Sequence, residues 1–156
     1  ESGLTPAMMR AVLRGVAKRH GGVGMAVVDY IQLMDANKAL PNNRNQELTA
    51  ISRDIKRMAM DFNMPFVVIS QLTKDVEKMK RRPTNGDLRE SGAIAQDADM
   101  IMMVHRQEKY ESNPTHEHIG KAEIIITKNR NGECGTVHCG YDGGTFRFYE
   151  LGKESW

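Results

Sequence analysis

The stretch MAVVDYIQLM, residues 25–34, decides the fold class of this chain. Its first four residues form a short apolar run, and Asp29 follows directly at the end of that run. Such a run is typical of a strand buried in a parallel sheet, with its carboxyl end facing a site. The stretch therefore predicts an α/β protein with Asp29 at the functional rim of the sheet.

The segments on either side support the same fold class. Apolar residues at helical spacing predict helices over residues 6–20 and 44–62. β-rich apolar runs predict strands over residues 66–69, 100–104 and 123–127, and a hairpin over residues 136–141 and 145–149. We therefore expect a mainly parallel sheet with flanking helices and an antiparallel hairpin at one edge.

Length and composition limit the class of protein. A chain of 156 residues with 40% hydrophobic content suits a single domain, so we expect residues 1–156 to belong to one unit. Two cysteines and no apolar run of bilayer length favour a cytoplasmic protein with no membrane contact. The formal charge of +2 is too small to indicate nucleic-acid binding. A basic cluster fits phosphate contact and a solvated loop equally well; it comprises Lys74, Lys78, Lys80, Arg81 and Arg82.

Asp29 and Gln71 each follow an apolar strand, so we expect both on one rim of the sheet. P-loop ATPases place an aspartate there to orient a water on magnesium, although the position also suits a helix cap or turn. A neutral amide at Gln71 can sense a terminal phosphate through hydrogen bonds, or it can simply begin a loop.

The segment GDLRESGAIAQDADMIMMVHR, residues 86–106, predicts a phosphate-binding surface. Arg89 offers a guanidinium that matches phosphate geometry, with Glu90 beside it to orient the side chain. Gly92 allows a strand of nucleic acid to approach the main chain. Contacts of this kind read phosphates more than bases, so we expect little sequence preference. The alternative is a surface ion pair between Arg89 and Glu90.

The segment KNRNG, residues 128–132, places two cations at the end of a strand. Lys128 and Arg130 alternate along an extended segment, so they project to one side, and Asn131 begins a turn. Such cations can stabilise charge on a transferring phosphoryl group, as an arginine from a neighbouring subunit does. Without the other motifs, a solvent-exposed basic hairpin is the simpler interpretation.

Four motifs, VVDYIQLM, ISQL, DLRESGAIAQDAD and KNRNG, occur in this order, and with them nearly the whole chain resembles the motor domain of DnaB-type replicative helicases. The resemblance implies a RecA-like, P-loop ATPase-type fold. It also implies a hexameric ring that couples ATP hydrolysis to movement along single-stranded DNA and to duplex unwinding. The implied partners are single-stranded DNA, identical subunits, a helicase loader and primase, in a bacterium or with a phage or plasmid origin.

The resemblance also implies roles for individual residues. Asp29 corresponds to the Walker B aspartate, which holds Mg²⁺ through water, and Gln71 corresponds to the sensor of the ATP phosphate. Arg89, Glu90 and Gly92 correspond to the loop that grips the DNA backbone. Lys128 and Arg130 correspond to the pair that reaches the nucleotide of a neighbouring subunit.

One half of an ATPase site is missing from the sequence. Nothing matches GxxxxGK[ST], the loop that holds nucleotide phosphates, and Glu1 is the only acidic residue before Asp29. We therefore assign no general base and expect a C-terminal portion of an ATPase domain, inactive alone, from an ATP-dependent helicase. The alternatives are a RecA-like DNA- or partner-binding module without its own ATPase activity, and another RecA-type ATPase such as a recombination protein.

Overall fold

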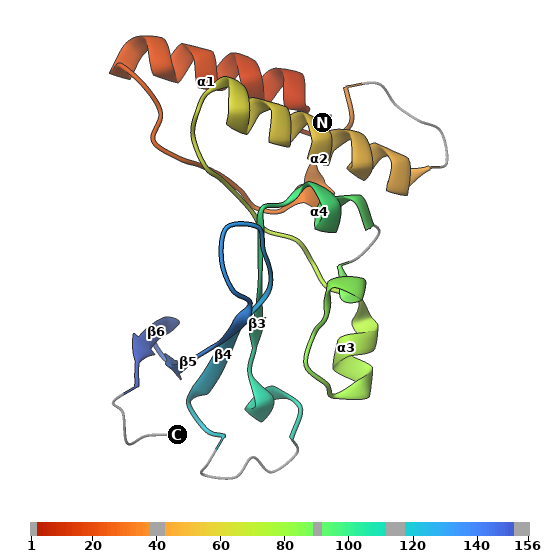
Figure 1. Cartoon of the computed structure of the whole chain (residues 1–156), viewed down its shortest axis with the longest axis vertical. Coiled ribbons are helices and arrows are strands. Elements are labelled where there is room, and N and C mark those ends of the chain that lie inside the picture. The colour runs from red at the N-terminus through yellow and green to blue at the C-terminus, as the bar shows by residue number, and fades with distance from the viewer. Residues whose placement is uncertain (1–2, 38–42, 89–91, 112–117, 152–156) are drawn as a thin grey trace. The chain divides into compact units, whose positions relative to one another are not determined.

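The computed structural model describes residues 3–37, 43–88, 92–111 and 118–151, and Figure 1 shows its elements. The chain divides into two compact units. The first unit comprises residues 1–72 and 88–98, and the second comprises residues 73–87 and 99–156. Arg89 and Glu90 lie outside the described residues. None of the helices in the described ranges is both long and apolar enough to cross a membrane.

The first unit places helices around a parallel strand pair. Its elements are α1 (Pro6–His20), β1 (Ala26–Val28), the 3-10 turn η1 (Ile31–Leu33), α2 (Arg44–Asp61), β2 (Phe66–Val68) and α4 (Gly92–Asp97). Helix α1 begins where the Thr5 hydroxyl accepts a hydrogen bond from the Met8 amide, at 3.3 Å. It ends at Gly21, whose φ of 76° is left-handed. Strands β1 and β2 pair in parallel, with Val28 opposite Val68.

The core of the first unit lies under α2. Leu48, Ile51 and Met58 are completely buried, because their spacing puts them on one face of that helix. Residues of α1, β1 and the η1 segment pack in the same cluster, including Met9, Leu13, Val28, Ile31 and Met34. The opposite face of the strand pair is open in the described structure, since Val27 and Val67 are 58% and 42% exposed.

The second unit is an antiparallel sheet with the strand order β3-β4-β5-β6. Its elements are α3 (Lys74–Met79), the 3-10 turns η2 (Asn85–Asp87) and η3 (Gln107–Lys109), and strands β3 (Met100–His105), β4 (Lys121–Asn129), β5 (Gly135–Asp142) and β6 (Arg147–Glu150). Burial alternates along β3, so Ile101 and Met103 are buried while Met102 and Val104 are more than half exposed.

Each predicted helix and strand has a counterpart in the structure. The helices over residues 6–20 and 44–62 form as α1 and α2, and the predicted hairpin forms as β5 and β6. The α/β class is confirmed, but antiparallel pairing extends further than one hairpin, because β3 and β4 also pair antiparallel. A parallel return would need a crossover, whereas the described part of the β3–β4 connection contains only the short η3 turn.

Candidate functional site

Asp29 and Gln71 lie just beyond the carboxyl ends of two adjacent parallel strands, as predicted. The Ile69 amide donates to the Val28 carbonyl at 2.9 Å, and the Ile31 amide donates to the Ile69 carbonyl at 3.0 Å. These bonds carry the pairing of the backbones past the strand ends. Both residues are exposed, and their side chains form no hydrogen bond or ion pair with any other described residue. A carboxylate and an amide are therefore available to a ligand at this rim.

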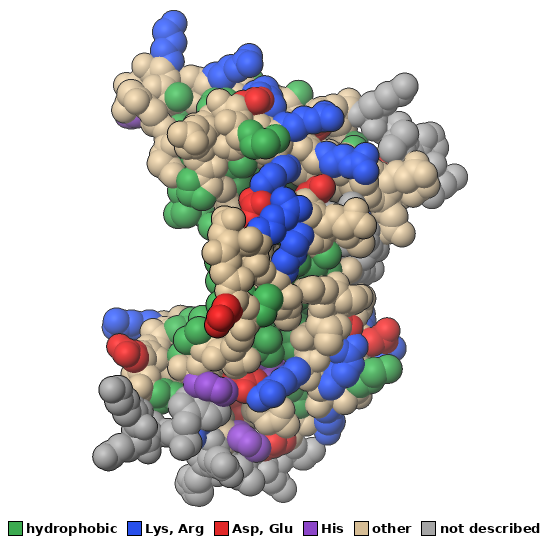
Figure 2. All heavy atoms as spheres, viewed as in Figure 1, with side chains coloured by type: hydrophobic (Ala, Val, Ile, Leu, Met, Phe, Trp, Pro, Cys, Tyr) green, Lys and Arg blue, Asp and Glu red, His purple; other side chains and the backbone are tan. Residues whose placement is uncertain are grey.

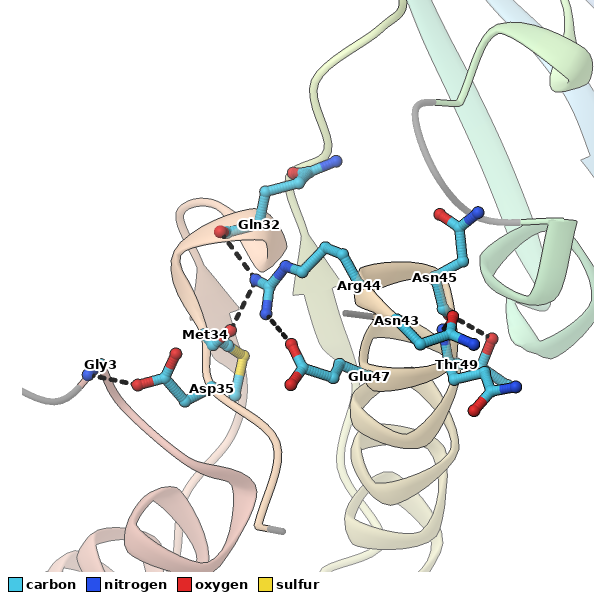
Figure 3. A network of polar contacts seen from close by, with 10 residues as sticks. Gly3, Gln32, Met34, Asp35, Asn43, Arg44, Asn45, Glu47 and Thr49 are labelled. Carbon is cyan, nitrogen blue, oxygen red and sulfur yellow. Dashed lines mark hydrogen bonds and ion pairs between the residues drawn. The ribbon is translucent and has the colours of Figure 1, made fainter. Parts of the chain in front are cut away.

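A network of polar contacts supports the backbone behind this rim (Figure 3). Arg44, the first residue of α2, donates through Nη2 to the carbonyl oxygens of Gln32 and Met34, at 2.9 and 2.8 Å. Its Nη1 atom pairs with Glu47 at 2.8 Å. A planar guanidinium suits such forked contacts, which a lysine cannot reproduce. Arg44 thus ties the turn after β1 to the start of α2.

Gln32 extends this network to the segment that follows β2. Its Nε2 atom donates to the Ser70 hydroxyl at 3.0 Å, and its Oε1 atom accepts the Gln71 amide at 3.3 Å. Sequence reasoning missed Gln32 and Arg44. The position of Gln32 in the motif after Asp29 was a signal for its importance, but neither contact follows from local sequence.

Lys128 lies near the carboxyl end of β4 and Arg130 directly follows that strand, in the second unit. Lys128 is half-buried and sits opposite Ile101 in the sheet, whereas Arg130 begins the turn toward β5. The Arg130 guanidinium pairs with the Asp99 carboxylate at 3.2 Å, and both side chains are about half exposed. The Arg130 amide also donates to the Asp99 carbonyl at 2.9 Å. The Arg130 cation therefore lies directly after β4, where it forms an ion pair with an exposed carboxylate of the same chain.

A β-bulge directs this end of β4. Ile101 pairs with Lys128 but Met102 pairs with Ile126, so Thr127 is the extra residue. The Thr127 hydroxyl donates to the Asn85 side-chain oxygen at 2.6 Å. A bulge changes the direction of the residues that follow it, and here those include Lys128. The sequence carried no sign of this irregularity.

The predicted phosphate-binding loop is described only at its edges. Gly92 is exposed at the start of α4, and a Cβ added there would meet no described atom within 4 Å. Contacts among the described residues therefore do not require a glycine at this position. The roles predicted for Arg89, Glu90 and Gly92 stay predictions.

Asp87 precedes that loop and belongs to the second unit. Its buried carboxylate accepts two hydrogen bonds of 2.6 Å from Arg81. It accepts two more, both of 2.8 Å, from the amide and hydroxyl of Thr84. The hydrogen bonds from Arg81 hold the pKa of Asp87 well below its usual value. The carboxylate therefore stays charged at neutral pH and fixes the turn.

The basic cluster of residues 74–82 is not a simple solvated loop. Its first part forms α3, and Arg82 donates to the buried Glu123 carboxylate through Nε at 2.8 Å. Arg81 likewise bonds Asp87. These two arginines are thus engaged inside the unit. A basic surface that sequence reasoning missed lies on α1, where Arg14, Lys18 and Arg19 are exposed and Arg10 pairs with Asp61 at 2.5 Å. Figure 2 shows Lys and Arg side chains gathered over the first unit.

The rim offers the carboxylate of Asp29 to Mg²⁺, which fits the water-mediated contact that the sequence predicts. No group of three or more His, Cys, Asp or Glu side chains within the described ranges could hold a metal ion. Mg²⁺ commonly keeps several waters and is held by one or two carboxylates together with substrate phosphates. The exposed Asp29 carboxylate suits that arrangement, which does not depend on a protein cage.

Comparison with known proteins agrees with these features. The sequence profile of the DnaB-like helicase C terminal domain matches residues 1–150. The chain is 46% identical over 154 residues to the replicative DNA helicase DnaB of Haemophilus influenzae, and 44% identical to that of Pasteurella multocida. These matches cover 98% of this chain and 32% of each relative. The chain thus spans about a third of the length of those relatives.

Two solved structures share the fold. The first is the structure of a DnaB-like replicative helicase and its interactions with primase. It has a TM-score of 0.88 and 32% sequence identity, and the match covers 97% of this chain and 37% of the helicase chain. The second is an isolated ATPase domain, with a TM-score of 0.86 and 32% identity, covering 96% of this chain and 52% of its own. The predicted RecA-like architecture is confirmed by these neighbours.

Proposed function

Because the chain belongs to the DnaB-like helicase C-terminal domain family, we propose that it is part of a hexameric replicative DNA helicase. The intact enzyme couples ATP hydrolysis to translocation on single-stranded DNA and to unwinding of the duplex. The observation that carries this proposal is a pair of exposed side chains at the ends of β1 and β2, Asp29 and Gln71, which no other described side chain engages.

The rim would bind ATP together with Mg²⁺. Asp29 orients water on the ion, which neutralises charge on the phosphates when it is bound. Gln71 donates its amide N–H to the terminal phosphate and reports the loss of that phosphate after hydrolysis. No described residue is assigned as general base.

Lys128 and Arg130 would serve the nucleotide of a neighbouring subunit. Their placement at and just beyond the carboxyl end of β4 supports this role. The exposed pair between Arg130 and Asp99 is weak enough to exchange for a phosphate. In a ring, each site would then hydrolyse ATP only when the adjacent subunit supplies its cations.

The loop of Arg89, Glu90 and Gly92 would contact the DNA backbone. Support comes from the family match, which includes this loop, and from the hydrogen bonds of Arg81 and Thr84 to Asp87, which hold the turn that precedes it. Two further proposed partners are primase and a helicase loader. Primase is proposed because a related helicase structure was described together with its interactions with primase. We place the protein in the cytoplasm of a bacterium, by likeness to the bacterial relatives.

We further propose that residues 1–156 form the C-terminal portion of one RecA-like domain. The solved ATPase domain is about half covered by this chain, and the sequence lacks a phosphate-loop motif. The exposed face of the parallel strand pair, which includes Val27 and Val67, also supports the proposal. Parallel sheets of this fold class are covered on both faces, so another segment of the same domain would cover this face of β1 and β2. Because the phosphate-loop motif is missing, this chain alone should hydrolyse no ATP.

Mixed rings test the proposed function. In an intact helicase, Arg130→Ala subunits should bind nucleotide but lower hydrolysis at the adjacent wild-type sites. Damage confined to the mutant subunit's own site would contradict the contact between subunits. Arg89→Ala should weaken DNA binding while the ring still assembles, and unchanged DNA affinity would count against the loop assignment.

The absence of GxxxxGK[ST] also favours a second candidate, a RecA-like DNA- or partner-binding module without ATPase activity. DNA-stimulated ATP hydrolysis by the purified full-length protein separates the two. Robust hydrolysis supports the helicase, and DNA binding without hydrolysis supports the module.

A further inference from the structure

Gln32 makes a contact that the proposed function leaves unexplained. Strand β2 ends at Val68, so Ser70 and Gln71 lie beyond the ladder. The single side-chain amide of Gln32 bonds both of these residues, donating to the Ser70 hydroxyl and accepting the Gln71 N–H. Only the backbone of Gln71 is held in this way; its side chain forms no hydrogen bond with the described part of the chain.

The backbone of Gln32 is itself held by a hydrogen bond from Arg44. Arg44 donates to the Gln32 carbonyl oxygen and, from the same Nη2 atom, to the Met34 carbonyl oxygen (Figure 3). Glu47, at 19% side-chain exposure, orients the guanidinium from α2. The fork fixes the turn that carries Gln32, and the turn directs the amide toward Ser70 and Gln71.

We propose that Gln32 is a positioning residue that sets the direction of Gln71 toward the nucleotide, and that Arg44 supports it. This inference rests on the proposed function, in which Gln71 contacts the terminal phosphate. Contact with phosphate requires close placement of the donor, and Gln71 lies in the short link between the end of β2 and the antiparallel bridge of Leu72 with Leu88. Within this link, the Gln32 amide holds both the Ser70 hydroxyl and the Gln71 N–H.

The test compares variants of the intact helicase. Gln32→Met keeps the size of the side chain and removes both hydrogen bonds. We expect kcat for ATP hydrolysis to fall about tenfold, with KM changing less than about threefold. Ser70→Ala removes one of the two bonds and should give a smaller loss, while Gln46→Met, at an exposed position on α2, should change neither constant.

A double-variant cycle separates positioning from a purely structural role. If Gln32 acts through Gln71, adding Gln32→Met to Gln71→Ala should cause no further loss of kcat. Independent, multiplying losses would overturn the inference, as would wild-type kcat in Gln32→Met. Wild-type hydrolysis by Gln71→Ala would instead overturn the sensor role on which the inference rests.

Hydrogen exchange gives a readout besides activity. The Gln71 amide should exchange about tenfold faster in Gln32→Met, because its acceptor is gone, while amides inside α2 keep their protection. Arg44→Lys should produce a smaller increase at the same amide, since lysine cannot reproduce the fork. Unchanged exchange at Gln71 in Gln32→Met would refute the proposed restraint.

Discussion

Replacing Asp87 by alanine removes a buried carboxylate that receives four hydrogen bonds. Asp87 is 5% exposed and accepts two bonds from Arg81 and two from Thr84. The loss leaves the Arg81 guanidinium and the Thr84 amide without their shared acceptor. We expect the turn of residues 81–87 to loosen and the second unit to lose stability.

The size of the loss follows from the surroundings of the donors. Hydrogen bonds to charged groups contribute about 1.5–3 kcal/mol each, and breaking a fully buried ion pair costs about 3–5 kcal/mol. The Arg81 side chain is 37% exposed, however, so water can solvate it once Asp87 is gone. We therefore expect Asp87→Ala to lower the free energy of unfolding by about 2–3 kcal/mol.

Urea unfolding followed by circular dichroism measures this free energy, and hydrogen exchange at the Thr84 amide reports the turn directly. The matched control is Asp75→Ala, which removes an exposed carboxylate 3.9 Å from Lys78 and should cost less than about 0.5 kcal/mol. If Asp87→Ala and Asp75→Ala unfold at the same urea concentration and Thr84 keeps its protection, the reasoning about the buried anchor is wrong.

Three further outcomes are expected. Leu48→Ala should lower the free energy of unfolding by about 2–5 kcal/mol, because Leu48 is completely buried, whereas Met60→Ala at 62% exposure should change it little; urea unfolding compares them. Arg81 lowers the pKa of Asp87 in the folded protein below the ordinary value of 3.8. The stability that this carboxylate contributes is therefore fully present above pH 3.8 and declines as the pH falls toward the lowered pKa. Urea titrations at several pH values should show a weaker loss of stability in acid for Asp87→Asn. Asp99→Asn should change the free energy of unfolding by less than about 1 kcal/mol, since the Asp99 carboxylate is about half exposed in its pair with Arg130; thermal unfolding measures the change, and a larger loss would contradict this expectation.

Several local features were predictable because neighbours in the sequence produce them. Thr5, Pro6 and Gly21 bound α1, and the apolar spacing of α2 selects its buried face. The placement of Asp29 and Gln71 at one rim followed from the strand pattern, because parallel neighbours end at the same edge of a sheet. Helix α3 was missed, because a charged segment of six residues carries little helical pattern.

The composition of the basic cluster did not predict that two of its arginines form internal ion pairs. Arg82 reaches Glu123, 41 positions away in the sequence, and Glu123 is buried only because the sheet forms around it. A run of cations therefore looked available for phosphates when two of its members hold internal carboxylates.

Amino-acid order alone was enough to predict the two long helices, the strands, the α/β class and the motif residues at the strand ends, because caps, turns and hydrophobic periodicity act over a few positions. Tertiary structure was needed for what surrounds those residues. Gln32 meets Ser70 and Gln71 across 38 and 39 positions, and Arg130 meets Asp99 across 31. Such contacts exist only after packing brings distant segments within hydrogen-bond reach, so no local pattern encodes them.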